Sequence, residues 1–440
     1  MQAGAREAAL KALERCRRDG AWSGASIDGA IKKYSLERRD AALASRLCLG
    51  ALQNGSLCDY YIDLYCSRGA SRLEPKLRDI LRLGVYQLLF LDRIPARAAV
   101  NESVALCKSA GLDRAGGLVN AILRRIAENR DALPDIPGAG TAEYLSIKYS
   151  HPLWLVRRVC AERGYAFTEA FLAANNSPSG ITIQVNTLRV GLSDYKRALD
   201  AAGIEYRETE LLPGCLELAG GSIDALPGYG EGLFYVQDRA ARMAVDIAAP
   251  ESASRVMDAC AAPGGKSFAA AIAMRNTGNI LARDIHEKKL ALIRSGAQRL
   301  GIDIIETQAR DAREPDAASE AGFELVIADV PCSGFGVMGK KPEIRLKKED
   351  EIAKLPEIQR QILDNVSAFV KPGGTLLYST CTILRAENEE IAEGFLAAHS
   401  EFEPLDFKTC DIASARGMYT FWPNTDGTDG FFAAKMRRKT

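Results

Sequence analysis

The sequence contains little histidine, no C-x-x-C pair and no long apolar run. Eleven cysteines are scattered along 440 residues, and only His151, His286 and His399 accompany them. Neither a structural zinc site nor a disulfide framework is expected from this pattern, and reduced thiols are the default. No stretch approaches the roughly 18 consecutive apolar residues that a membrane-spanning helix needs. The first twenty residues predict an amphipathic helix rather than a signal peptide. We therefore expect a cytoplasmic protein that binds neither a metal nor a membrane.

Two nucleotide-binding signatures are absent from the glycine-rich segment 258–266, which reads Asp-Ala-Cys-Ala-Ala-Pro-Gly-Gly-Lys. A P-loop needs glycine five residues before its Gly-Lys pair, and Cys260 stands there. The dinucleotide fingerprint G-x-G-x-x-G needs its third glycine where Lys266 stands. An apolar run precedes the segment and a run of small residues follows it, which predicts a strand, a tight turn and a helix start.

A turn of this kind places a nucleotide-type ligand at a helix N-terminus. An adenosyl ligand without a pyrophosphate remains possible, and S-adenosylmethionine fits that description. A turn that merely reverses the chain is the alternative. The predicted cofactor-binding residues of this loop are Cys260, Ala261, Ala262, Pro263, Gly264, Gly265 and Lys266.

The zero net charge of the whole chain hides an asymmetry between its two ends. Residues 1–134 contain 22 Lys and Arg against 15 Asp and Glu, and the remaining residues carry the opposite excess. A basic surface suits a polyanion such as RNA, although a solvated helical surface would give the same count. We expect RNA contact at the front of the chain.

Hydrophobic periodicity and turn residues divide the chain into several parts, and a length prior of about 150 residues per domain suggests roughly three domains. Residues 1–134 repeat apolar side chains at helical spacing and predict an all-α domain. Residues 135–141, rich in proline and glycine, read as a linker. Residues 142–250 mix helical and β-type runs and predict a small α+β module.

Residues 251–440 alternate strands with helices, which predicts an α/β Rossmann-like domain with a parallel, doubly wound sheet. The expected strands are Arg255–Asp258, 279–284, 304–308, 325–329 and 375–379. Ligands bind such sheets at the carboxyl ends of the strands.

Acidic residues stand at the ends of two expected strands. Asp284 closes the second strand 19 residues after Gly265, near the spacing at which a carboxylate accepts the hydroxyls of a ribose. Asp311 follows the third strand and is predicted to receive the exocyclic amine of adenine. A helix N-cap is the alternative for each aspartate.

Two cysteines occupy equivalent places after two other strands. Cys332 follows the strand that ends at Asp329, and Cys381 follows the strand that ends at Ser379. Both thiols should therefore face the crevice that holds the cofactor loop. A thiolate there can add covalently to an electrophilic carbon, and helix N-termini together with Lys266 favour its ionised form.

These segments resemble signature motifs of a known family. The segment 258–266, Asp329-Val-Pro-Cys-Ser-Gly334 and Thr380-Cys381 are similar to motifs of the RNA 5-methylcytosine methyltransferases of the Nop/Sun family. The likeness extends to 234–238 and 429–432. The segments 98–103 and 117–124 resemble the NusB-type RNA-binding fold, so the resemblance covers nearly the whole chain. The chain departs from the family pattern in Thr382, where serine often follows the cysteine, and in Arg310, where glycine is common.

The resemblance implies a role for each residue of the predicted catalytic set. Cys381 would add to C6 of cytosine, and Cys332 would help to release the product. Asp329 would hydrogen-bond N3 or the exocyclic amine of the base and also line the cofactor site, with Lys266 assisting nearby. The general base that removes the C5 proton is not identified.

The resemblance also implies a substrate, and the NusB-like front domain favours a cytosine in small-subunit (16S) ribosomal RNA. The same chemistry on tRNA is the first alternative, and a non-catalytic RNA-binding assembly factor is the second. We expect RNA rather than DNA as the partner, and a monomer.

Overall fold

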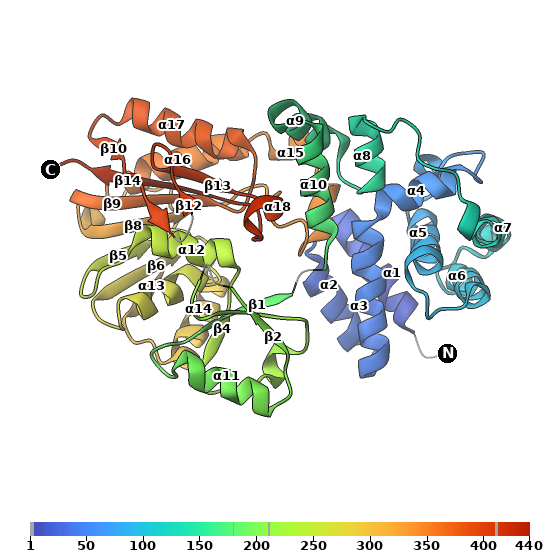
Figure 1. The fold of residues 1–440 in the computed structure, drawn as a ribbon, viewed down its shortest axis with the longest axis horizontal. Helices are drawn as coiled ribbons and strands as arrows, with labels where there is room; N and C mark the ends of the chain where they lie inside the picture. Colours follow the sequence, from blue (N-terminus) through green and yellow to red (C-terminus); the bar gives the residue numbers. More distant parts are fainter. Residues whose placement is uncertain (1–3, 179, 210–211, 410–411) are drawn as a thin grey trace. The chain divides into compact units, whose positions relative to one another are not determined.

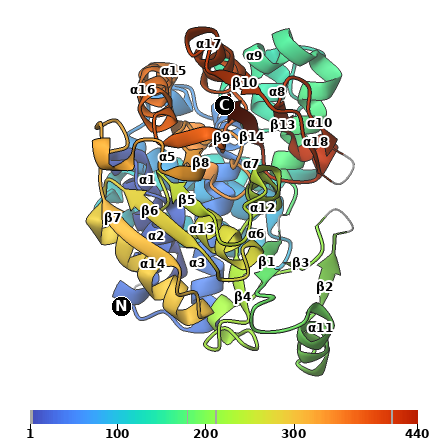
Figure 2. The same cartoon turned by 90° about the vertical axis from the view of Figure 1, so that its left-hand side faces the viewer.

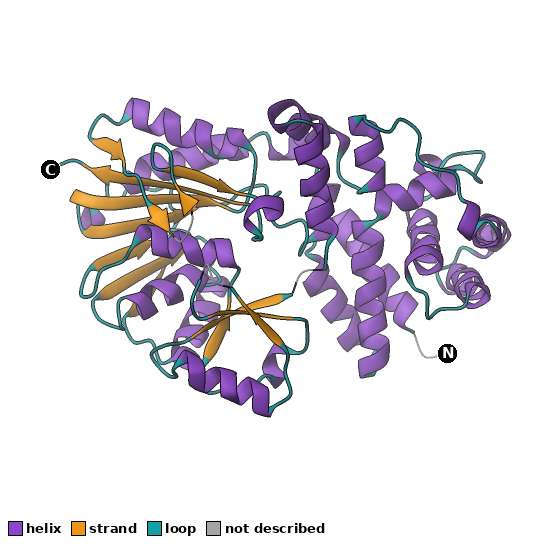
Figure 3. Ribbon diagram, viewed as in Figure 1, coloured by secondary structure: helices purple, strands orange, loops and turns teal. Residues whose placement is uncertain are grey.

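The computed structural model describes residues 4–178, 180–209, 212–409 and 412–440, and these form two compact units. The first unit consists of Met1–Ser177 and Met338–Asp350, and the second consists of Pro178–Val337 and Glu351–Thr440. Figure 1 shows the course of the chain through both units. Every strand of the described chain lies in the second unit (Figure 3).

Ten α-helices build most of the first unit. Seven of them come from the predicted helical region and share one core: α1 (Ala5–Asp19), α2 (Ser23–Lys33), α3 (Arg38–Gln53), α4 (Gly55–Asp63), α5 (Pro75–Phe90), α6 (Ala96–Ser109) and α7 (Gly116–Glu128). Pro75 opens α5 at a position where its missing N–H has no intrahelical acceptor. The all-α prediction for 1–134 is confirmed.

Three further helices, α8 (Ala142–Lys148), α9 (Leu153–Arg163) and α10 (Tyr165–Asn176), also belong to the first unit. The Ser150 hydroxyl accepts a hydrogen bond from the Leu57 N–H at 2.9 Å, and the Gln53 amide donates to the Asn176 carbonyl at 3.1 Å. Spatial packing therefore divides the chain after Ser177, whereas the sequence pattern placed residues 142–177 in the same module as the strands that follow them.

The segment Met338–Asp350 packs with the helices of the first unit although it lies within the catalytic part of the sequence. Its 3-10 turn, Pro342–Leu346, buries Glu343 and Arg345. The Glu343 carboxylate accepts from the Ser23 N–H and hydroxyl at 2.9 and 2.6 Å. The Arg345 guanidinium donates to the Gln53 carbonyl at 2.6 Å and to the Asn176 side-chain oxygen at 2.7 Å. A buried charge needs such partners, and nothing in the sequence pattern predicted them.

The second unit begins with a small antiparallel sheet in the order β2-β3-β1-β4. Its strands are β1 (Ile181–Val185), β2 (Tyr206–Glu208), β3 (Cys215–Leu218) and β4 (Phe234–Val236). Helix α11 (Leu192–Ala201) covers one face by burying Tyr195 and Leu199 against it. This sheet and helix give the α+β architecture that was expected after the front helices.

The larger sheet has the order β10-β14-β9-β8-β5-β6-β7, with β13 paired to β14. Its parallel part contains β5 (Arg255–Asp258), β6 (Asn279–Asp284), β7 (Ile305–Ala309), β8 (Phe323–Asp329) and β9 (Val370–Thr380). The antiparallel edge contains β10 (Phe402–Pro404), β13 (Met418–Phe421) and β14 (Phe431–Arg438). The five predicted strands are confirmed, and β9 begins earlier than expected.

Helices cover both faces of this sheet (Figure 2). Helices α12 (Arg239–Ala248), α13 (Gly265–Ala273) and α14 (Glu287–Leu300) share one core with the strands, and α16 (Leu355–Ser367) and α17 (Glu389–Ala398) share another. The short elements α15 (Glu349–Ile352), α18 (Pro423–Asp426), β11 (Lys408–Thr409) and β12 (Ile412–Ala413) complete the order. The Rossmann-like prediction is confirmed.

No helix in the described ranges is long and apolar enough to cross a membrane.

Candidate active site

The cofactor loop connects β5 to α13 as the sequence predicted. The Ala261 N–H donates to the Arg283 carbonyl, and the Gly264 N–H donates to the Ala261 carbonyl, both at 2.7 Å. Gly264 has a φ of +112°, and a Cβ there would lie 2.6 Å from the Phe268 ring. Glycine is thus required by both backbone conformation and space. The loop presents small side chains and the N–H groups of α13 at one edge of the sheet.

Asp258 lies directly beneath this loop and is fully buried. Its Oδ2 accepts from the Ser267 hydroxyl at 2.7 Å, and a backbone hydrogen bond from Cys260 also reaches this carboxyl group. Burial raises the pKa of Asp258 to about 7, against the hydrogen bond from Ser267 and the charge of Lys266.

The two aspartates predicted to hold the adenosyl group stand at the ends of their strands. Asp284 ends β6, and its Oδ1 accepts from the His286 N–H at 2.9 Å. Asp311 follows β7, and its two oxygens accept from the Arg313 side chain at 3.0 and 3.1 Å. The Arg313 guanidinium lowers the pKa of Asp311. Asp284 therefore has an oxygen to offer a ligand, whereas Asp311 is already engaged by an arginine.

These residues fit S-adenosylmethionine. The carboxylate of Asp284 has an oxygen that suits ribose hydroxyls, and the loop carries only small side chains at Ala261 and Ala262, beside the start of helix α13. The bound cofactor would supply an electrophilic methyl group on a sulfonium.

The two cysteines lie together, as their positions after neighbouring strands predicted. Strand β8 pairs with β9 in parallel, with Asp329 opposite Ser379, so the loops that follow leave the sheet side by side. The Sγ atoms of Cys332 and Cys381 are 3.2 Å apart. The hydrogen bond with Cys381, together with burial, raises the pKa of Cys332 well above its usual value.

Lys266 and Asp329 form an ion pair beside the thiols. The Lys266 Nζ donates to the Asp329 Oδ2 at 2.6 Å, and the Ser379 hydroxyl donates to the Asp329 Oδ1 at 2.8 Å. The Lys266 ammonium also lies 5.0 Å from the centre of the Phe431 ring. The Asp329 side chain is 31% exposed and that of Lys266 only 9%, so the carboxylate is the member of the pair that a ligand can reach.

Sequence reasoning missed the residues that hold the two cysteine loops in place. The Glu387 Oε2 accepts from the Ser333 N–H and from the Gln359 amide, both at 2.8 Å. The hydroxyls of Ser333 and Thr382 share a hydrogen bond of 2.8 Å. These buried groups join both loops, and only a structure shows that they converge, because Gln359 lies on a helix between the motifs.

A glycine contact ties the same loops to the edge strand. The Gly336 N–H donates to the Cys381 carbonyl at 3.0 Å, and the Gly430 N–H donates to the Gly336 carbonyl at 2.8 Å. A Cβ on Gly336 would lie 1.8 Å from the Gly430 oxygen. This close approach explains why the segment before β14 belongs to the site.

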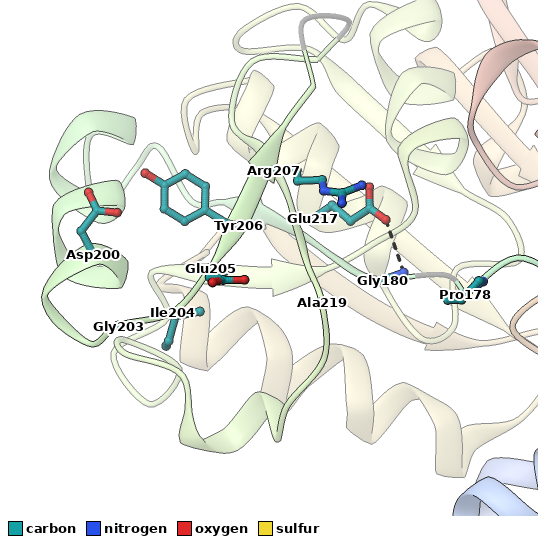
Figure 4. Close-up of a pocket in the computed structure, with 10 residues that line it drawn as sticks. All are labelled: Pro178, Gly180, Asp200, Gly203, Ile204, Glu205, Tyr206, Arg207, Glu217 and Ala219. Carbon is teal, nitrogen blue, oxygen red and sulfur yellow. Dashed lines mark hydrogen bonds between the residues drawn. The ribbon is translucent and has the colours of Figure 1, made fainter. Parts of the chain in front are cut away.

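A second hollow, of about 840 Å³, lies in the small sheet module and contains none of the motif residues (Figure 4). Asp200, Glu205 and Glu217 line it together with a single arginine, Arg207. The Glu217 Oε1 accepts from the Gly180 N–H at 3.3 Å. Its described lining carries a negative excess, which does not suit an RNA phosphate.

No group of three metal-ligating side chains is present in the described parts of the chain, and the ten cysteines described there are all free thiols.

Comparison with known proteins follows the same division of the chain. A family model described as 16S rRNA methyltransferase RsmB/F matches residues 245–437, and the NusB family model matches residues 3–128. A ferredoxin-like domain model of RsmF/B-like methyltransferases matches residues 151–223. "Probable ribosomal RNA small subunit methyltransferase B" of Bacillus subtilis is 34% identical over 443 residues, covering 99% of this chain and 98% of the relative. The chain belongs to the ribosomal RNA small subunit methyltransferase B family.

Other relatives agree with membership of the methyltransferase B family. The Escherichia coli protein named ribosomal RNA small subunit methyltransferase B is 31% identical over 405 residues, 91% of each chain. The crystal structure of PH0851 is 29% identical and has a TM-score of 0.83 over the whole of both chains. Membership confirms an rRNA methyltransferase, its NusB-like front end and S-adenosylmethionine as its methyl donor.

Proposed function

We propose that this chain transfers a methyl group from S-adenosylmethionine to C5 of a cytosine in small-subunit ribosomal RNA through a covalent adduct between Cys381 and C6. The observation that carries the proposal is the pair of thiols 3.2 Å apart beside the ion pair of Lys266 and Asp329. Methylation of a ring nitrogen or a ribose hydroxyl would need no thiol, whereas methylation of C5 needs a nucleophile that adds to C6.

The chemistry assigns different work to the two thiols. Cytosine C5 is too weak a nucleophile to accept a methyl group until a thiolate adds to C6 and converts the ring to an enamine. Either thiol can be the donor in the hydrogen bond between Cys332 and Cys381, and this bond together with burial raises the pKa of Cys332. Cys381 is the proposed nucleophile because Thr380-Cys381 resembles the nucleophile motif of the family, and Cys332 takes the releasing role.

Asp329 and Lys266 act on the base and on each other. The exposed carboxylate of Asp329 is proposed to accept a hydrogen bond from the exocyclic amine of cytosine, or from N3 once N3 carries a proton, which fixes the ring against Cys381. Lys266 holds that carboxylate in place, assisted by the Ser379 hydroxyl. After methyl transfer a base takes the C5 proton, the electron pair of that C–H bond restores the C5–C6 double bond, and Cys381 leaves C6 as a thiolate that Cys332 is placed to protonate.

Access to C6 requires a cytosine that is outside a helical stack. The proposed substrate is therefore a single-stranded or flipped-out cytosine of the ribosomal RNA. The basic, NusB-like front end supports RNA as the partner.

The test supplies methyl-labelled S-adenosylmethionine together with unmodified small-subunit rRNA or unmodified tRNA, followed by digestion to nucleosides. We expect label in 5-methylcytosine from the rRNA. Label confined to tRNA would replace the substrate, and label in another nucleoside would remove the proposal.

Two variants test the covalent step. The variant Cys381→Ala should form no product while binding RNA normally. The variant Cys332→Ala should accumulate a protein–RNA adduct that survives denaturing electrophoresis, because the product is released slowly. A Cys381→Ala protein with full activity would contradict the proposed nucleophile.

A further inference from the structure

An exposed tryptophan of the first unit lies against a lysine-rich segment. The Trp22 residue is 51% exposed although it stands at the start of helix α2. The Lys341 Nζ lies 4.6 Å from the centre of a Trp22 ring, and the Lys347 Nζ lies 5.9 Å away. An aromatic face beside two ammonium groups can bind single-stranded nucleic acid. A base can stack on the aromatic ring, and the ammonium groups can bind phosphates.

The local structure fixes this arrangement. Ser23, next to Trp22, donates two hydrogen bonds to the buried Glu343 carboxylate, so the tryptophan is anchored to the same turn that carries the lysines. The neighbouring carboxylate is thereby directed inward and removed from the surface, where it would repel phosphate. Lysine pairs flank the turn on both sides, at Lys340 and Lys341 before it and at Lys347 and Lys348 after it.

We propose that Trp22, Lys341 and Lys347 form a docking platform on which a base of the substrate RNA stacks on the indole while the lysines bind adjacent phosphates. The inference rests on the proposed function in that the RNA is the one that this enzyme methylates. The platform assigns the RNA contact to particular side chains. The charge count alone assigned that contact only to the region 1–134.

The platform differs from an ordinary surface cation–π pair. The Lys33 Nζ lies 5.6 Å from the centre of the Tyr34 ring at the other end of helix α2, but there a single lysine accompanies a ring on a residue that is less exposed than Trp22. The pair of Lys33 and Tyr34 therefore provides a matched control for the loss of one positive charge beside an aromatic ring.

The first experiment measures whether a base stacks on Trp22. The chain has three tryptophans, so replacement of Trp154 and Trp422 by phenylalanine leaves Trp22 as the only indole. With melting temperature checked, titration with unmodified small-subunit rRNA should quench its fluorescence and protect it from acrylamide. Unchanged fluorescence and unchanged acrylamide quenching at saturating RNA would overturn the proposal.

The second experiment compares RNA affinities without a methyl donor, so that its outcome does not depend on which nucleotide is methylated. Trp22→Ala should weaken binding by about 5- to 100-fold, and Trp22→Phe should retain most of the affinity. Lys341→Ala should lower the salt dependence of binding by about one phosphate contact. Equal losses of RNA affinity in Lys33→Ala and Lys341→Ala would show that only the total positive charge matters. That result would refute the platform. If the platform passes this test while the product is not 5-methylcytosine, the proposed function fails and the docking inference stands.

Discussion

The two sides of the candidate site at the sheet edge differ in what their functional side chains contact. On the side of β8 and β9 the polar groups engage one another, with Lys266 on Asp329 and Cys332 on Cys381. On the side of β5 and β6, Asp258 accepts from the Ser267 hydroxyl, and Asp284 uses only one of its oxygens, on the His286 N–H. The thiols and the ion pair hold one another before any ligand arrives, whereas Asp284 on the cofactor side keeps an oxygen that a ligand can use.

This difference predicts which substitutions should change turnover and which should change binding of the cofactor. A preorganised group lowers the barrier because it needs no rearrangement during reaction, whereas an unsatisfied group contributes when its ligand binds. Substitutions on the thiol side should therefore reduce kcat, and substitutions on the cofactor side should reduce the affinity for S-adenosylmethionine.

The largest expected effect comes from crowding the cysteine loops with Gly336→Ala. The added Cβ would lie 1.8 Å from the Gly430 oxygen and 2.8 Å from the Cys381 oxygen, so both loops must shift. Displacement of reacting groups by about 1 Å costs on the order of 100-fold in rate. We expect that loss in kcat with unchanged cofactor affinity. The control is Gly394→Ala on α17, where a Cβ meets nothing within 4 Å.

The next effect is predicted for Lys266→Met, which leaves the Asp329 carboxylate without its ion-pair partner. The base would then be held by a carboxylate that is free to move, and we expect kcat to fall by roughly 100-fold. Lys371→Met removes an ion pair of the same 2.6 Å length with Glu324 and serves as the control, measured by single-turnover methylation. Similar rates for both variants would show that the ion pair of Lys266 and Asp329 is only structural.

A smaller effect is expected for Asp284→Asn on the cofactor side. Loss of a charge-assisted hydrogen bond to a ribose hydroxyl should weaken binding of S-adenosylmethionine by about 10-fold, with kcat at saturation retained. Isothermal titration calorimetry measures the affinity of this variant for S-adenosylmethionine. The control is Asp303→Asn, the same substitution at an exposed loop position. A fall in saturated kcat with unchanged affinity would contradict the separation of the two sides.

The last prediction concerns stability and its dependence on pH through Asp258. Its pKa of about 7 in the folded state exceeds the ordinary carboxyl value, so the folded state binds more protons than the unfolded state between about pH 4 and 7. The free energy of unfolding should therefore fall as pH rises through that window, by at most about 1.4 kcal/mol per pH unit. Urea unfolding of the ligand-free protein at pH 5 and 8 should show this fall, and Asp258→Asn should lessen it. An identical pH dependence in the variant would contradict the assignment.

Local sequence signals predicted much of the fold and the positions of the motif residues. Periodicity located the helices before residue 134, and strand ends located Asp284, Asp329 and the two cysteines at one sheet edge. These signals are short-range, so they identify each element and the edge at which its residues lie.

Contacts between distant segments could not be predicted in this way. The buried hydrogen bonds of Glu387 join it to Ser333 and Gln359, and Gln359 lies outside the sequence motifs. The pairing of Asp311 with Arg313 depends on the direction of the side chains rather than on their spacing in the sequence. The membership of Met338–Asp350 in the first unit has no compositional signal, because Glu343 and Arg345 look like surface charges in the sequence.

That membership has a consequence for the order in which the protein is completed during synthesis. When residues 1–177 have left the ribosome, all ten described front helices have been synthesised. Glu343, which accepts hydrogen bonds from Ser23, and Arg345, which donates to Gln53 and Asn176, have not yet been made. Domains commonly fold as units from the N-terminal end. Here the first unit gains its last buried partners only after residue 350 has emerged, so a nascent chain that stops within 178–337 leaves the front helices unfinished as well.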